Sequence, residues 1–228
     1  MNSRDRLADA ALVRHSVVRI SRDAWNACIA SQPTLANDPL VRNWAAHGWP
    51  LVVRRRGPCE AQEIDVPLGL PLPPIAGKRR ISMVVPADAI ISVEPPPKLS
   101  MLRDVAPCTW RATIDELVSI ARRHQVDCRA FGSLAWQGLT GLSYLSECSD
   151  LDLLFDLPRA MDVLDALEAL LADVAMCDAL APMRIDGEVI RTDGAGANWR
   201  ELHAAESDVI VKTAADVVLA TVRVFVEG

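Results

Sequence analysis

The sequence predicts an α+β protein of two parts, on the basis of two kinds of pattern. Short apolar runs typical of strands fill the first part, whereas the second part alternates helical spacing with strands. The parts meet at the run Pro95-Pro96-Pro97, whose residues cannot donate backbone hydrogen bonds and favour an extended conformation. We therefore expect an N-terminal α+β domain at residues 1–98 and a second domain at residues 99–228.

Local patterns predict the elements of the first part. Four apolar runs read as strands, at residues 17–20, 51–54, 81–85 and 90–93. A short helix is expected to begin after Ser21 and to carry Trp25, and a second helix, carrying Trp44, is expected to end at Gly48. The proline-rich residues 67–74 are expected to form an irregular loop.

In the second part, helical spacing runs from Trp110 to near His124. Alternating residues predict strands at 126–130, 151–155 and 209–211. A helix is expected to follow Pro158, with Met161 on its apolar face. Residues 183–190 resemble strand material on either side of a turn.

Composition excludes several classes of function. The formal net charge of −6 argues against a general affinity for nucleic acid, whose binding requires clustered cations. No apolar stretch is long enough to span a membrane, and the N-terminus lacks the apolar segment of a secretory signal. The six cysteines contain no C-x-x-C pair, so we expect reduced thiols in a cytoplasmic protein.

The candidate chemistry lies at Asp150 and Asp152, on the strand that follows a Gly132-Ser133 pair. Successive side chains of a strand alternate faces, so the two aspartates are expected to project together while Leu151 enters the core. No lysine or arginine stands beside them to neutralise their charge. Two such carboxylates favour a divalent cation and predict a phosphoryl or nucleotidyl transfer site.

The order of helix, strand, Gly-Ser, helix and Asp-x-Asp strand resembles the nucleotidyltransferase superfamily typified by DNA polymerase beta. The resemblance implies a polymerase-beta-like fold for residues 99–228. It implies that Gly132 and Ser133 approach a triphosphate at a helix start, where the helix dipole favours anions. It also implies that Asp150 and Asp152 hold magnesium.

The superfamily usually adds a third carboxylate from a later strand, for which Asp186 and Glu188 are both candidates. They alternate onto one face if their segment is extended. The dipeptide Asp186-Gly187 is also a strong hairpin signal, so Asp186 could instead form a turn. We expect Asp186 to be the third metal ligand, with Glu188 as the alternative.

A more specific resemblance covers nearly the whole chain. The matching segments are Arg14-His15 and residues 48–55, 67–74, 77–80, 131–145, 149–153, 186–189, 199–202 and 211–213. They are similar to the phosphoribosyl-dephospho-CoA transferases, the holo-acyl-carrier-protein synthases of malonate decarboxylase. The resemblance implies transfer of the prosthetic group from triphosphoribosyl-dephospho-CoA to a serine of the apo acyl-carrier subunit, with release of pyrophosphate.

Three alternatives remain open at this stage. The acceptor could be the carrier of citrate lyase, because its enzymes perform the same transfer. The chain could be a minimal nucleotidyltransferase that uses ATP, or a binding module without activity. We further expect Lys212 to meet a substrate phosphate, and the basic runs at 54–56 and 78–80 to dock the anionic carrier or donor through the N-terminal domain.

Overall fold

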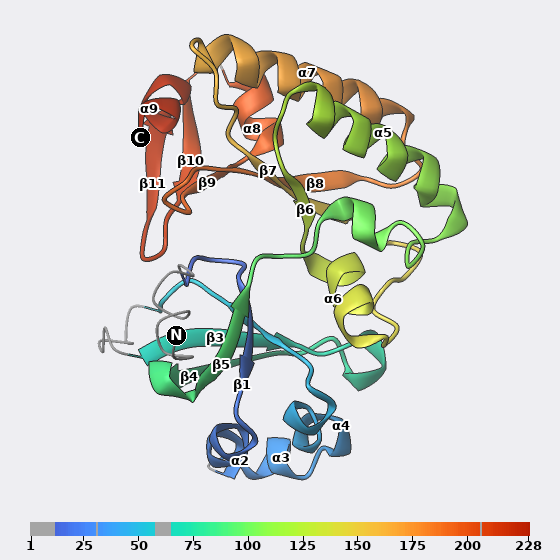
Figure 1. Ribbon diagram of the computed structural model, residues 1–228, viewed down its shortest axis with the longest axis vertical. Helices are drawn as coiled ribbons and strands as arrows, with labels where there is room; N and C mark the ends of the chain where they lie inside the picture. Colours follow the sequence, from blue (N-terminus) through green and yellow to red (C-terminus); the bar gives the residue numbers. More distant parts are fainter. Residues whose placement is uncertain (1–11, 31, 58–64, 206) are drawn as a thin grey trace, which may run out of the picture. The chain divides into compact units, whose positions relative to one another are not determined.

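The computed structural model of the protein describes residues 12–30, 32–57, 65–205 and 207–228 (Figure 1). The chain divides into two compact units, Met1–Pro95 and Pro96–Gly228. Each unit has its own β-sheet and its own helices, so the protein is a two-domain α+β protein, as the sequence predicts. No helix in the described ranges is long and apolar enough to cross a bilayer.

The sheet of the first unit is antiparallel throughout its described strands, in the order β4-β3-β2-β1-β5. Its strands are β1 Val17–Ile20, β2 Leu51–Val53, β3 Asp65–Pro71, β4 Arg80–Pro86 and β5 Ile90–Glu94. Four of these five were predicted from apolar runs. The fifth, β3, lies where we expected an irregular loop, so that prediction is wrong.

Strand β3 accommodates two prolines because its neighbour β2 is short. The carbonyl of Pro67 accepts a hydrogen bond from the backbone N–H of Arg54 at 3.0 Å. In an antiparallel pair the nitrogen and the carbonyl of one residue face the same neighbour, so the nitrogen of Pro67 also faces the β2 side. Because β2 ends at Val53, the ladder requires no donor there. Pro71 lies beyond the other end of β2, since Gly69 pairs with Val52.

The helices of the first unit are short, and their described segments are α2 Arg22–Ala30, α3 Pro33–Ala36, α4 Pro39–Arg42 and the 3-10 turns Ala45–His47, Pro74–Ala76 and Ala87–Ala89. Helix α2 begins as predicted, where the Ser21 hydroxyl accepts from the N–H of Ala24 at 3.1 Å. The second predicted helix is instead divided into single turns. Pro39 starts a new turn that Asp38 caps, although the segment does end at Gly48 as predicted.

The second unit contains a mixed sheet, whose described strands follow the order β11-β10-β9-β8-β7-β6. The strands are β6 Cys128–Ala130, β7 Leu151–Asp156, β8 Ile185–Ile190, β9 Gly196–Asn198, β10 Asp208–Lys212 and β11 Val217–Thr221. Strands β7 and β8 are parallel, whereas the other described neighbours are antiparallel. The strands predicted at residues 126–130, 151–155 and 209–211 are confirmed as β6, β7 and β10.

The helices of the second unit are α5 Arg111–Arg123, α6 Gly132–Thr140, α7 Val163–Leu180, α8 Trp199–Ala204 and α9 Val222–Glu227, with 3-10 turns at Leu99–Leu102 and Cys108–Trp110. Helix α5 occupies the predicted range. Helix α7 begins later than predicted, because Asp162 caps it by accepting from the N–H of Asp165. Met161 therefore precedes the helix and is fully exposed, so its predicted place on the apolar face is wrong.

Helices α5 and α7 cover one face of this sheet (Figure 1). Alternate residues of β7, namely Leu151, Leu153 and Phe155, are completely buried against this layer. The residues between them face the other side of the sheet. The polar residues of β7 and β8 are thereby separated from the main core and gathered on the opposite face.

Candidate functional site

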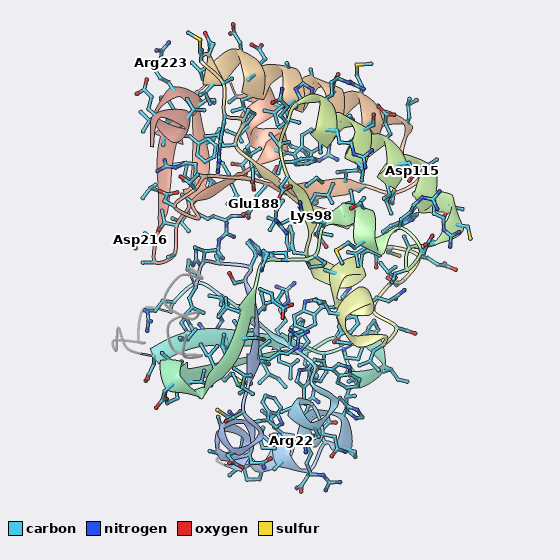
Figure 2. The ribbon with its side chains drawn as sticks, in the orientation of Figure 1. Arg22, Lys98, Asp115, Glu188, Asp216 and Arg223 are labelled. Carbon is cyan, nitrogen blue, oxygen red and sulfur yellow. The ribbon has the colours of Figure 1, made fainter. Side chains whose placement is uncertain are left out.

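Two carboxylates lie side by side on the sheet face opposite α5 and α7. Asp152 of β7 and Asp186 of β8 are direct partners in the parallel register. Neighbouring strands lie about 4.8 Å apart, and residues in register project from the same face. Glu188, labelled in Figure 2, is two residues further along β8 and projects from that face too. The strand geometry therefore brings Asp152, Asp186 and Glu188 onto one surface.

Gly132 lies directly against the Asp152 carboxylate. Its φ of +63° is in the left-handed region, and a Cβ at this position would overlap Asp152 Oδ2 and lie 2.6 Å from Asp152 Cγ. The backbone N–H of Phe131 donates to the Asp152 carbonyl at 3.0 Å, which fixes the loop to β7. A side chain at residue 132 would displace the carboxylate, so the position requires glycine.

Gly132 and Ser133 form the first turn of α6, as the sequence predicts for the Gly-Ser pair. The first N–H groups of a helix have no acceptor within the helix, and they carry the positive end of its dipole. The Asp152 carboxylate therefore lies beside a helix start that attracts anions.

Asp186 is held by two donors on one oxygen. Asp186 Oδ1 accepts from the backbone N–H of Gly187 at 2.8 Å and from Asn198 Nδ2 at 3.0 Å. Strand β8 runs through Gly187 without a break, so the predicted turn at Asp186-Gly187 is wrong. The glycine serves close packing instead, because a Cβ there would overlap the carbonyl oxygen of Leu153 on β7.

Glu188 is engaged differently from Asp186. Its side chain is almost completely buried, and Oε1 accepts from Lys212 Nζ at 2.9 Å. Lys212 ends β10 and keeps 39% of its side chain exposed. Its ammonium thus neutralises Glu188, and its predicted contact with a phosphate stays a prediction.

Asp150 immediately precedes β7 and is half-buried. The next residue, Leu151, donates its N–H to the Arg184 carbonyl at 2.9 Å, which holds this end of the strand beside the approach to β8. The predicted common role of Asp150 and Asp152 stays a prediction. In the described part of the chain, no group of three or more His, Cys, Asp or Glu side chains is arranged to hold a metal ion.

The cysteines are free thiols wherever the structure describes them, at Cys28, Cys108, Cys128, Cys148 and Cys177. Cys59 lies outside the described residues. Burial raises the pKa of Cys177 to about 11 and also raises the pKa of Cys128. These two thiols are therefore core residues and not candidates for a reactive cysteine.

The predicted basic runs are used partly inside the first unit. Arg54 Nε donates to the Leu68 carbonyl at 3.1 Å, and Arg79 forms an ion pair of 2.9 Å with Asp38. Lys78 and Arg80 are exposed. All three side chains of the run at 78–80 are therefore exposed, and Arg79 is paired with Asp38.

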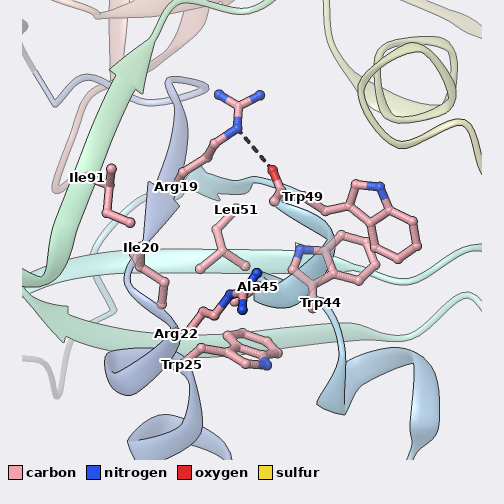
Figure 3. A pocket seen from close by; sticks show the side chains of 10 residues that line it. Arg19, Ile20, Arg22, Trp25, Trp44, Ala45, Trp49, Leu51 and Ile91 are labelled. Carbon is pink, nitrogen blue, oxygen red and sulfur yellow. Dashed lines mark hydrogen bonds between the residues drawn. The ribbon is translucent and has the colours of Figure 1, made fainter.

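The first unit also contains a small pocket of about 150 Å³, shown in Figure 3. Its lining includes Trp25 and Trp44, whose indole N–H groups donate to the carbonyls of Val41 and Pro50 at 3.0 and 2.9 Å. Arg19 lies at its edge and donates through Nε to the Gly48 carbonyl at 3.0 Å. The pocket thus combines apolar walls with a cationic edge.

Comparisons with known families match the chain in two consecutive segments. Residues 13–96 match the N-terminal domain of the phosphoribosyl-dephospho-CoA transferase MdcG, and residues 98–223 match the C-terminal domain of the same protein. No solved structure matches the chain.

Relatives from several bacteria are similar over most of their length. A phosphoribosyl-dephospho-CoA transferase from Bradyrhizobium diazoefficiens is 44% identical over 94% of this chain and 92% of its own. Proteins of the same name from Xanthomonas campestris and Xanthomonas euvesicatoria are 34% and 33% identical, over 87% and 89% of this chain and 89% and 91% of their own. The two domain matches and these identities establish that the chain belongs to the phosphoribosyl-dephospho-CoA transferase family.

Proposed function

We propose that the chain transfers the phosphoribosyl-dephospho-CoA group from triphosphoribosyl-dephospho-CoA to a serine of the apo acyl-carrier subunit of malonate decarboxylase. The serine oxygen forms a bond to the α-phosphorus, the bond from that phosphorus to the bridging oxygen breaks, and pyrophosphate leaves. The serine proton passes to solvent water, and the product is a phosphodiester. Membership of the family supports the reaction, and one observation supports its place: Asp152 and Asp186 are in register beside the start of α6.

The site has the ligand types that magnesium prefers. Mg²⁺ in phosphoryl-transfer sites is held by one or two carboxylates, while substrate phosphates and water complete its shell. The pair of neighbouring strand carboxylates, Asp152 and Asp186, fits that pattern. When bound, the ion would neutralise charge that develops on the transferred and departing phosphates. Asp152 and Asp186 would hold it, with Asp150 as a further ligand.

Asp186 is a better third carboxylate than Glu188. Asp186 Oδ2 has no hydrogen-bond partner among the described residues, whereas Glu188 is buried and already paired with Lys212. A carboxylate whose charge is neutralised by an adjacent ammonium attracts a cation less strongly. In this assignment Glu188 and Lys212 support the site together, and the exposed part of Lys212 remains available to a phosphate.

The chain's own groups then orient the donor. The first N–H groups of α6, at Gly132 and Ser133, bind the departing phosphates, and the Ser133 hydroxyl adds a donor. The acceptor serine would approach from the side of Asp150 and Asp152, and a cation held there would favour the ionised form of its hydroxyl. The succession of α5, β6, α6 and β7 agrees with a polymerase-beta-like arrangement, which we propose for the second unit.

We assign recognition of the donor or the carrier to the first unit. Lys78 and Arg80 supply exposed positive charge, and both substrates are anionic. Replacing both cations with glutamate is expected to raise the acceptor KM more at low salt than at high salt. An unchanged acceptor KM would contradict a role of Lys78 and Arg80 in binding the carrier.

The reaction is tested by intact-mass spectrometry of the apo carrier after incubation with the protein, Mg²⁺ and triphosphoribosyl-dephospho-CoA. The expected result is a mass gain equal to the donor minus pyrophosphate. Parallel incubations with ATP and with the citrate lyase carrier identify the substrates. Modification with ATP alone, or of the citrate lyase carrier alone, would contradict the proposal.

A further inference from the structure

Asn198 joins the proposed metal-binding face to the start of helix α8. Its Nδ2 donates to Asp186 Oδ1 at 3.0 Å, and its Oδ1 accepts from the backbone N–H of Arg200 at 2.9 Å. The second bond caps α8 and requires the oxygen of the amide to point at the helix. The amide nitrogen must then point at Asp186, so the orientation of the side chain is determined by the fold.

The start of α8 is itself firmly attached to β8. Trp199 Nε1 and Arg200 both donate to the carbonyl of Ile185, at 3.2 and 2.9 Å. Arg200 also donates to Asp178 Oδ1 at 2.6 Å, and the same oxygen accepts from the N–H of Ile185 at 2.9 Å. Trp199 is buried, with the guanidinium of Arg200 lying 4.4 Å from its ring centroid. These bonds fix the residue that directly precedes Asp186.

The consequence for Asp186 is a defined orientation of its carboxylate. With Oδ1 receiving N–H groups from Gly187 and Asn198, rotation of the carboxylate about its last torsion would break both bonds. Oδ2 is thereby directed away from these donors, on the sheet face that carries Asp152. Hydrogen bonds of this kind to a ligating carboxylate are the usual means by which proteins orient metal ligands.

We propose that Asn198 is a positioning residue, which holds the Asp186 carboxylate ready for the divalent cation. The inference rests on the proposed function, because it presumes that Asp186 is a ligand. Serine at residue 198 can still cap α8 but is too short to reach Asp186. Aspartate can also cap, but it would place an acceptor against Asp186 Oδ1 where a donor is required. Both variants therefore separate the cap from the contact with Asp186.

The test measures Mn²⁺ binding to the full chain, with Mn²⁺ alone, by the electron paramagnetic resonance signal of the free ion. Asn198→Ser and Asn198→Asp are expected to weaken Mn²⁺ binding by about 10- to 100-fold, the range typical for loss of an outer-shell partner. The kcat of the transfer reaction should fall, whereas the KM for the carrier should change less. Asp162→Ser is the matched control, because it alters the cap of α7 without contact to Asp186.

The outcomes distinguish the inference from the proposed function. Wild-type Mn²⁺ affinity and kcat in Asn198→Ser would overturn the positioning role while leaving the transferase intact. Equal losses of Mn²⁺ affinity in Asn198→Ser and Asp162→Ser would also overturn it, because a general effect of helix caps would then explain the result. Absence of both Mn²⁺ binding and transfer in the wild type would overturn the proposed function and this inference together.

Discussion

Replacing Gly132 with alanine tests whether the Asp152 carboxylate must lie against the first turn of α6. The new Cβ would overlap Asp152 Oδ2 and lie 2.6 Å from Asp152 Cγ. Ordinary contact between carbon atoms begins at about 3.5 Å, so the carboxylate must move by about 1 Å. The φ of +63° adds backbone strain, which for a residue other than glycine costs about 1 to 2 kcal/mol.

The expected effect on catalysis exceeds the effect on stability. A misplacement of about 1 Å at a reacting group can cost on the order of 100-fold in rate, or about 2.7 kcal/mol of transition-state stabilisation. We therefore expect kcat/KM for pyrophosphate release to fall by roughly two orders of magnitude. The free energy of unfolding should fall by only about 1 to 2 kcal/mol, so the variant remains folded.

Gly141→Ala provides the matched control at the other end of the same helix. Gly141 has a φ of +74°, but a Cβ there would meet no atom within 4 Å. Both variants carry the strain of a positive φ, and Gly132→Ala adds the overlap with Asp152, so it should lower the melting temperature at least as much as Gly141→Ala. Only Gly132→Ala should lose activity, and equal kcat/KM values in the two variants would refute the role of the contact between Gly132 and Asp152.

Three further substitutions or measurements follow from the structure. A hydrogen bond from His124 lowers the pKa of Asp173 in the folded protein. The contribution of Asp173 to the stability of the fold is therefore complete above its unfolded pKa of about 3.9, and it is lost as the pH falls through its lower pKa in the folded state. Thermal melts of Asp173→Asn should thus fall below wild type at neutral pH and converge with it in acid, and a pH-independent difference would contradict this. A thiol reagent should modify exposed Cys148 in the native state and Cys177 only after unfolding; rapid native labelling of Cys177 would contradict its burial. Glu188→Ala should lower the free energy of unfolding, measured with urea, by about 1.5 to 3 kcal/mol, because it removes a hydrogen bond to the charged Lys212. An unchanged free energy of unfolding would show that the pair of Glu188 and Lys212 does not stabilise the fold.

The sequence predicts those parts of the fold whose signals are local. Strands β1 and β7 are apparent because their apolar residues alternate or run together, and α5 is apparent from its helical spacing. Strand β3 could not be predicted in this way. Its prolines are compatible with a strand only because β2 is short, and the length of a neighbouring strand is a tertiary property.

For the proposed site, the local signals predict the elements but not the pairing between them. Asp152 lies on the predicted strand and Gly132 lies at the predicted helix start. The sequence could not decide between a turn and a strand at Asp186, because parallel pairing with β7 overrides the local turn preference. Asn198 carried no recognisable signal, since a lone asparagine is an ordinary helix cap until the fold brings Asp186 to its other end.

The central claim is that Asp152 and Asp186 together hold the divalent cation beside the start of α6. Crystals grown with Mn²⁺ and pyrophosphate would test it through the anomalous scattering of manganese. The account predicts an anomalous peak within bonding distance of oxygens from both carboxylates, with pyrophosphate oxygens completing the shell. A peak bound only by Glu188, or one remote from Gly132, would contradict the account.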